Sequence, residues 1–181
     1  IISTIFVLSV AYSMSRMRFK MRKPFMNIAM IIGLFPSFMS MIAVYYILRA
    51  LNLADGAMIR VALIIVFSAG SGAGFYVAKG FFDTISKSLD EAAIIDGATR
   101  WNVFTKVTVP LSKPIIVYTI LTSFMGPWVD FIFGKVICRA DAQYYTVSIG
   151  LWKMLEKEYI DSWYTCFAAG AVVVSIPIAI L

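Results

Sequence analysis

The sequence predicts an all-α protein that crosses a membrane several times. Of its 181 residues, 61% are hydrophobic and 14% are charged, whereas a soluble domain is nearer half apolar and a quarter charged. The apolar residues also gather in five long runs with almost no charge, and a charged insert separates two of these runs. We therefore expect one transmembrane helical bundle of residues 1–181, with spans at about 1–15, 25–48, 57–77, 115–134 and 163–181 and the insert at 78–114.

The lengths of the runs support this assignment. A helix needs about 20 apolar residues to cross the hydrocarbon core of a bilayer, and the complete runs have roughly that length. The first run is short, the chain begins without Met, and the last run ends inside apolar sequence. We therefore expect the chain to be a fragment. Pro36 and Pro177 lie inside runs and mark either hinges and cavity walls or positions where a membrane helix merely tolerates proline.

Positive charge predicts the topology, because cytoplasmic loops are enriched in Lys and Arg. The segment Arg16–Lys23 and the insert 78–114 carry five Lys/Arg each, and alternation of the spans puts both on one side. The other side carries one in Arg49–Gly56 and four in Lys135–Ser162. This bias of ten to five predicts that the insert is cytoplasmic in a multi-pass protein of the cell membrane.

The insert has the pattern of two short capped helices. Ser88 and Glu91 fit a capping box, with Ser88 as the N-cap residue and Glu91 at the third helical position. Gly97 stands where a left-handed residue would end this first helix. Thr99 can cap a second helix, which Pro110 is expected to stop. The pattern predicts a compact element of two helices joined at Gly97.

Small residues leave the surface of this element nearly bare. Ala92, Ala93, Gly97 and Ala98 have little or no side chain, so another backbone could approach closely. One interpretation is an amphipathic connector on the bilayer surface, although basic residues suit a lipid surface better than the acids at the start of this helix. A docking element for a cytoplasmic protein explains both the bare surface and the acids.

Eight positions of the insert form one pattern together with Leu111 and Pro114: Glu91, Ala92, Ala93, Asp96, Gly97, Ala98, Phe104 and Pro110. This pattern resembles the EAA loop of ABC importer permeases, most closely that of the maltose/maltodextrin-type subunit in the carbohydrate branch. Arg16-x-Arg18-Phe19, Gly80-Phe81-Phe82 and Tyr145–Leu151 add to the resemblance. The eight positions, together with Ser88, are thereby implied to couple the chain to an ATPase.

The resemblance implies the type I ABC importer permease fold, without the first family helix and the extreme C-terminus. It also implies a homologous second permease subunit, two nucleotide-binding ATPase subunits and an extracytoplasmic solute-binding protein, which the outer segment Lys135–Ser162 would face. That segment also fits an interfacial aromatic belt. The chain has no Walker A sequence, so we expect no enzymatic activity and no cofactor on it, with ATP and Mg on the partner ATPase subunits.

Trp128, Asp130 and Phe131 are the candidate substrate path. Asp130 is the only acid inside an apolar run, and such residues often serve function. A carboxylate can accept hydroxyl hydrogen bonds, and Trp128 offers an aromatic face to a sugar ring. The alternative is that Asp130 lies at the membrane interface, near the outer end of its helix. Carbohydrate permeases often have a Trp-Asn-Glu/Asp-Phe motif here, and Val129 departs from that pattern.

The remaining motifs do not point to catalysis or metal binding. Gly70 and Gly74 form a GxxxG pair, which favours helix packing over phosphate binding because no Gly-Lys-Ser/Thr follows. The chain has no His, and Cys138 and Cys166 have no metal or redox spacing. We therefore expect no catalytic or metal site.

The sequence thus predicts the permease subunit of an ATP-driven importer. The resemblance favours a sugar, and an oligosaccharide among sugars, as the imported solute. A permease of the same fold for another solute is the alternative. An ion-coupled secondary carrier fits less well, because that class uses several ionisable residues inside the membrane.

Overall fold

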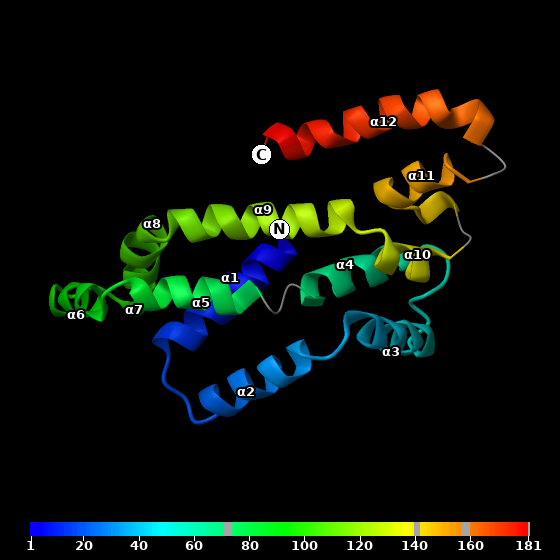
Figure 1. The fold of residues 1–181 in the computed structure, drawn as a ribbon. Coiled ribbons are helices and arrows are strands. Elements are labelled where there is room, and N and C mark those ends of the chain that lie inside the picture. The colour runs from blue at the N-terminus through cyan, green and yellow to red at the C-terminus, as the bar shows by residue number, and fades with distance from the viewer. Residues whose placement is uncertain (71–73, 140–141, 157–159, 181) are drawn as a thin grey trace. The chain divides into compact units, whose positions relative to one another are not determined.

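A computed structural model of the chain describes residues 1–70, 74–139, 142–156 and 160–180. The described residues form helices and connections, without a strand, as the sequence predicts (Figure 1). The elements are α1 (Ile2–Arg16), α2 (Arg22–Gly33), α3 (Ser37–Ala50), α4 (Met58–Gly70), α5 (Gly74–Thr84), α6 (Lys87–Ile95), α7 (Arg100–Asn102), the π-helical turn η2 (Val103–Thr108), α8 (Val109–Leu111), α9 (Lys113–Val129), α10 (Ile132–Cys138), the 3₁₀ turn η3 (Ala142–Tyr144), α11 (Val147–Lys153) and α12 (Ile160–Ile180).

The chain folds into two compact units, each made of two separate segments. Unit 1 comprises Ile1–Leu34 and Ser68–Ser123, and unit 2 comprises Phe35–Phe67 and Phe124–Leu181. The predicted charged insert therefore belongs wholly to unit 1, and the candidate substrate path belongs to unit 2.

Unit 1 is built on the packing of α1 against α5 (Figure 1). Each helix presents residues three or four positions apart, which is the spacing of one helix face. Ala11 of α1 and Ala78 of α5 are fully buried, and their small side chains let the two helices approach closely. The buried core consists of Val7, Ala11, Met14, Phe75, Ala78, Phe82 and Ile115.

The two predicted packing glycines contribute to unit 1 only in part. Gly74 begins α5 and faces Val7, where an added Cβ would make an ordinary van der Waals contact at 3.8 Å. Gly70 ends α4, and the residues between the two glycines lie outside the described part of the chain. Helix packing through this pair stays a prediction.

Unit 2 has a core of its own, around α10, α11 and the loop that joins α3 to α4. Gly134 of α10 is buried, and a Cβ there would lie 3.2 Å from side-chain atoms of Ile149 and Thr146. This glycine therefore allows the close approach of α10 to α11. The buried residues are Leu48, Ala54, Ile59, Ala62, Ile137, Cys138 and Ile149.

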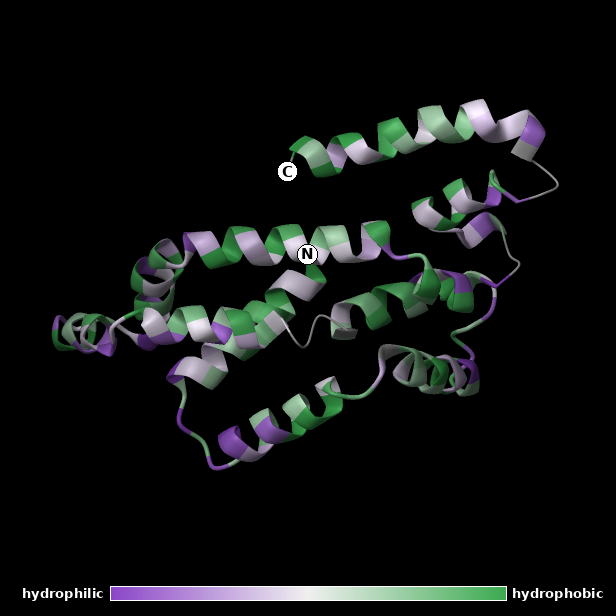
Figure 2. Ribbon diagram, in the orientation of Figure 1, coloured by the Kyte–Doolittle hydropathy of each residue, from purple (hydrophilic) through white to green (hydrophobic). Residues whose placement is uncertain are grey.

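Many large apolar side chains lie on the outside, as a membrane protein requires. Val172 and Val173 of α12 are each 63% exposed. Figure 2 shows hydrophobic residues along α9 and α12 and hydrophilic residues in the connection between α1 and α2. By length and composition, two helical stretches are able to cross a membrane. One is Met58–Thr84, which comprises α4 and α5 and includes residues 71–73 outside the described part of the chain, and the other is Asp161–Ile180. The number rises to four if each of two bent helix pairs counts as one span.

The apolar runs Phe25–Leu48 and Ile115–Gly134 each contain parts of two helices. The run Phe25–Leu48 is divided between α2 and α3, and Pro36 is the N-cap residue of α3. Proline disfavours helical backbone in the residue before it, so the first helix ends ahead of Pro36. Pro177, in contrast, lies inside α12. The run Ile115–Gly134 likewise contains α9 and the start of α10.

Candidate functional site

The bend at Gly97 has the geometry that the sequence predicts. Gly97 has φ +83°, which is left-handed backbone that an L side chain rarely adopts. Its N–H donates to the carbonyl of Ile94 at 3.0 Å, and the N–H of Ala98 donates to the carbonyl of Ala93 at 2.9 Å. These two bonds form a Schellman motif, which fixes where α6 ends and in which direction the chain leaves it.

The start of α6 differs from the prediction. The N-cap residue is Ser86, whose Oγ accepts a hydrogen bond from the Ser88 N–H at 3.3 Å. Ser88 therefore lies inside the helix, and Glu91 lies beyond the first turn, so the predicted capping box between these two residues is wrong.

The early start of α6 coincides with contacts from α1 that no local pattern encodes. Arg16, in the last turn of α1, donates from Nη2 to the Ile85 carbonyl at 2.9 Å, directly before the Ser86 cap. Its Nε lies 3.3 Å from Oδ2 of Asp90, one turn into α6. Arg16 thus contacts both Ile85, which precedes the Ser86 cap, and the first turn of α6, which begins at Lys87.

The second helical part of the insert begins as predicted and ends later. Oγ1 of Thr99 accepts a hydrogen bond from the Asn102 N–H at 3.3 Å, so Thr99 is a cap as expected. Pro110 lies one residue before the end of the helical stretch Arg100–Leu111, inside the short turn α8, so the helix continues past it by one residue. The helix ends at Ser112, where Arg100–Leu111 and Lys113–Val129 meet at a bend of 77°.

We call Lys87–Leu111 the coupling knob. Its outer surface carries Glu91, Ala92, Asp96 and Gly97, all exposed, beside Ile95, which is 85% exposed. Ala93 and Ala98 are half-buried. The small residues of the predicted pattern therefore lie together around the bend, as the sequence suggests.

Phe104 has a different place from the other members of the pattern. It is half-buried. The centroid of its ring lies 4.7 Å from the ring centroid of Tyr12 on α1 and 5.7 Å from that of Trp101. Phe104 therefore anchors the coupling knob to α1 instead of standing on its outer surface.

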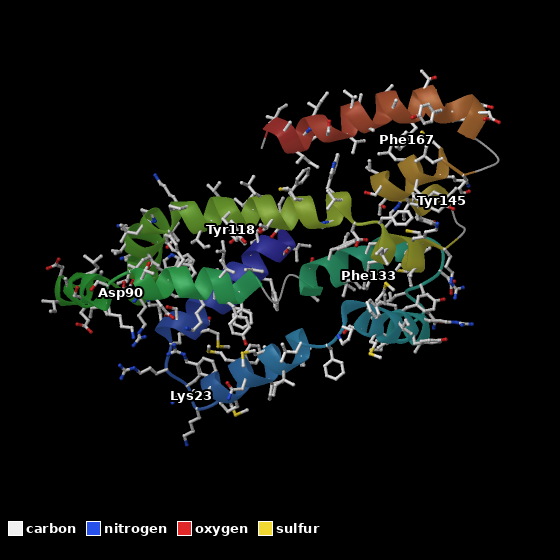
Figure 3. The ribbon with its side chains drawn as sticks, in the orientation of Figure 1. Lys23, Asp90, Tyr118, Phe133, Tyr145 and Phe167 are labelled. Carbon is white, nitrogen blue, oxygen red and sulfur yellow. The ribbon has the colours of Figure 1, made fainter. Side chains whose placement is uncertain are left out.

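The Arg16–Asp90 pair is the functional feature that sequence reasoning missed. The two side chains are 7% and 17% exposed, respectively, so the ion pair is largely shielded from water. A second link lies nearby, where Oγ of Ser15 donates to Oδ1 of Asp83 at 2.6 Å. Through these contacts α1 is tied to both the end of α5 and the start of α6. Figure 3 labels Asp90 on α6.

The three residues of the candidate substrate path are all engaged within unit 2. Nε1 of Trp128 donates to the Val174 carbonyl of α12 at 3.2 Å, and the Trp128 carbonyl accepts from Oγ of Ser148 at 3.0 Å. Its ring also stacks on Phe124, with the centroids 5.1 Å apart. Trp128 therefore joins α9 to α11 and α12.

Asp130 and Phe131 lie in the connection from α9 to α10. Oδ2 of Asp130 accepts a hydrogen bond from the Gly134 N–H at 2.8 Å and so satisfies a free donor at the start of α10. The ring centroids of Phe131 and Trp152 lie 5.2 Å apart, and Nζ of Lys135 lies over both rings. These contacts give both residues structural roles that the sequence pattern did not indicate.

A solved structure defines the class of this fold. A bacterial ABC transporter involved in the import of the acidic polysaccharide alginate matches 99% of the chain, with a TM-score of 0.78 and 27% sequence identity, over 66% of the matched chain. The chain therefore has the type I ABC importer permease fold. Residues 5–181 match the family of binding-protein-dependent transport system inner membrane components. The chain belongs to this family.

Two curated relatives of the chain are named as sugar-transport permeases. It is 33% identical over 180 residues to the galactooligosaccharides transport system permease protein GanQ of Bacillus subtilis and covers 62% of that protein. It is 32% identical over 178 residues to the maltose/maltodextrin transport system permease protein MalG of Vibrio vulnificus and covers 58% of it. The aligned shares of this chain are 99% and 94%, respectively. The chain thus spans about three-fifths of the relatives' length.

Proposed function

We propose that this chain is part of a permease subunit that imports a sugar, with an oligosaccharide favoured, and that the coupling knob connects its helices to a cytoplasmic ATPase. The observation that carries the proposal is the construction of the coupling knob. A Schellman motif fixes its bend at Gly97, small residues surround this bend, and Arg16 ties its first turn to α1. Such an element can bind in a cleft and move together with a membrane helix.

The rigidity of the coupling knob supports this role. An ATPase that closes on ATP must displace the membrane helices, and a flexible linker would absorb that displacement. The ends of α6 are fixed by the Ser86 cap and by the Gly97 motif. In the same unit, Phe104 packs on Tyr12 of α1. Movement of α6 would therefore be passed to α1.

Charge on the coupling knob supports a cationic counterpart on the ATPase. Glu91 is exposed, and no described residue of the chain forms an ion pair with it. Asp96 is also exposed beside the bend. Carboxylates in these places can accept charge-assisted hydrogen bonds from a partner.

The proposed complex contains a second, homologous permease subunit, two nucleotide-binding ATPase subunits and an extracytoplasmic solute-binding protein. ATP and Mg would be bound by the ATPase subunits, which would carry out the hydrolysis. The names of the relatives support a sugar as the solute, and the proposed path lies near Trp128, Asp130 and Phe131 of unit 2. The contacts of Trp128 support a role in holding α9, α11 and α12 around this path.

The test compares two glycines with left-handed backbone. Gly97→Val should weaken co-purification of the ATPase subunits or abolish sugar-stimulated hydrolysis, because a Cβ at positive φ costs about 1 kcal/mol and a branched side chain costs more. Gly56→Val is the matched control, because Gly56 has φ +57° and lies outside the coupling knob. Apart from the glycine's chain neighbours, no atom of the described residues lies within 4 Å of a Cβ added at either site, so backbone conformation is the shared perturbation.

The control should retain both co-purification and stimulated hydrolysis. Glu91→Ala provides an independent change on the same surface that leaves the bend intact. It should loosen docking more than about tenfold, because a charge-assisted hydrogen bond contributes about 1.5–3 kcal/mol. Normal co-purification, hydrolysis and uptake in both Gly97→Val and Glu91→Ala would refute the coupling role.

A further inference from the structure

Unit 1 contains a pocket of about 480 Å³ beside the coupling knob. Three parts of unit 1 line it. They are the last turns of α1 and the residues directly after them, the first two turns of α6, and the pair α7 and η2. Five basic side chains and two acidic ones line it, so the pocket is positively charged. The basic residues are Arg16, Arg18, Arg22, Lys87 and Arg100, and the acidic residues are Asp90 and Glu91.

The wall of this pocket contains a buried side chain with donors that no described residue satisfies. The Arg16 side chain is 93% shielded from solvent, since only 7% is exposed. Its Nη2 donates to the Ile85 carbonyl and its Nε forms the ion pair with Asp90, but neither Nε nor Nη1 has a hydrogen-bond partner among the described residues. Buried guanidinium donors are rarely left unsatisfied. Nη1 therefore indicates a place for an acceptor that the described residues do not supply.

The surroundings show what kind of acceptor fits. The apolar run of α1 ends at Ser15, so Arg16 lies where a helix leaves the hydrocarbon core on the side rich in Lys and Arg. Tyr12, Trp101 and Phe104 give the pocket an aromatic side, and Met17 at its edge is 48% exposed. A ligand with a phosphate group and an apolar body would match both the arginines and the aromatic side.

We propose that this pocket binds the phosphate headgroup of an anionic phospholipid of the cytoplasmic leaflet. Arg16 donates from Nη1, and Arg18 and Arg22 add the charge that selects an anionic lipid over a zwitterionic one. Because Arg16 also holds Asp90, the bound lipid stabilises the position of α6. The proposal rests on the membrane location of the family and not on the identity of the transported solute.

The chain offers a matched control for the test. Lys20 and Lys23 lie in the same basic segment as Arg18 and Arg22 but do not line the pocket. Figure 3 labels Lys23 at the start of α2. The double variants Arg18→Gln/Arg22→Gln and Lys20→Gln/Lys23→Gln therefore remove equal charge from one segment, and they differ in whether the pocket loses its contacts.

The experiment uses the full-length permease, purified in neutral maltoside micelles with the subunits that assemble with it. Dioleoylphosphatidylglycerol is titrated in, with dioleoylphosphatidylcholine as the zwitterionic comparison, and thermal unfolding and native mass spectrometry report stabilisation and retained lipid. We expect the phosphatidylglycerol to raise the Tm of the native protein. The arginine double variant should bind this lipid about tenfold more weakly than the lysine double variant, because it loses charge-assisted hydrogen bonds.

Three outcomes bear on the proposal. Equal weakening in the two double variants would overturn it, because general surface charge would then explain the binding. Stabilisation by inorganic phosphate that depends on Arg18 and Arg22, without an effect of the lipid, would overturn a lipid as the source of the phosphate group. Recovery of lipid binding by Arg18→Lys/Arg22→Lys would support the proposal, because charge would be restored and misfolding of the glutamine variant excluded.

Discussion

The pair of Arg16 and Asp90 should contribute measurably to stability and to coupling. Removing one partner of a fully buried ion pair costs about 3–5 kcal/mol, whereas an exposed pair contributes about 0–1 kcal/mol. The side chains here are 7% and 17% exposed and the atoms lie 3.3 Å apart. For Asp90→Asn we therefore expect a loss of about 2 kcal/mol in the free energy of unfolding.

A double-mutant cycle separates the pair from the other contacts of each residue. Arg16→Met also removes the bond to the Ile85 carbonyl, so it should cost more than Asp90→Asn. The double variant should be more stable than the sum of the single losses predicts, because neither partner is then left unpaired. Unfolding of the full-length protein by a rising fraction of denaturing detergent, followed by tryptophan fluorescence, gives the four free energies.

The functional readout of the same cycle is the amount of solute imported per ATP hydrolysed in reconstituted vesicles. If Arg16 passes the movement of α6 to α1, Asp90→Asn should lower this ratio while leaving hydrolysis measurable. If the two single losses of stability sum to the loss in the double variant within about 0.5 kcal/mol, the two residues do not interact. An unchanged transport ratio would refute the mechanical part of the reasoning.

Three further predictions follow from the topology, the helix cap and unit 2. In a background without native cysteines, a cysteine at Thr99 should resist an impermeant thiol reagent applied from outside, whereas one at Gln143 should react; labelling at Thr99 would reverse the predicted topology. Ser86→Ala should destabilise α6 by about 1 kcal/mol and Ser88→Ala by clearly less, as measured by hydrogen exchange of the α6 amides. A larger loss in Ser88→Ala than in Ser86→Ala would support the capping box of Ser88 and Glu91 instead. Trp128→Ala should lower uptake about fivefold through loss of a stacking contact, while Trp128→Phe should retain most of it. Unchanged uptake in both would place Trp128 outside the path.

The class of the fold could be predicted because it depends on composition. Long runs such as Ala57–Val77 contain too few polar groups to be stable in water, and a helix satisfies its own backbone inside a bilayer. The predicted side of the insert likewise rests on a count of Lys and Arg, and it stays a prediction. These properties sum over many residues and do not require knowledge of which residues are in contact.

Local hydrogen bonds were also within reach of the sequence. The left-handed residue at Gly97 and the cap at Thr99 involve partners within five positions along the chain, so the residue types identify them. Ser86 and Ser88 show the limit of this reasoning. Both are good caps, and local pattern favours Ser88 because Glu91 follows it at the right distance, yet the helix begins from Ser86.

The tertiary structure decided everything that joins distant segments. In the sequence, Arg16 is one of five positive charges in its segment and Asp90 is an acid at a helix start. Only the packing of α1 within unit 1 brings the two side chains together. Trp128 is an aromatic face in the sequence, but contact with Val174 and Ser148 makes it a link between helices. The sequence pattern does not show such contacts, because the partner of a side chain depends on how the whole chain folds. The chemistry of the side chain determines only which kinds of partner it can bind.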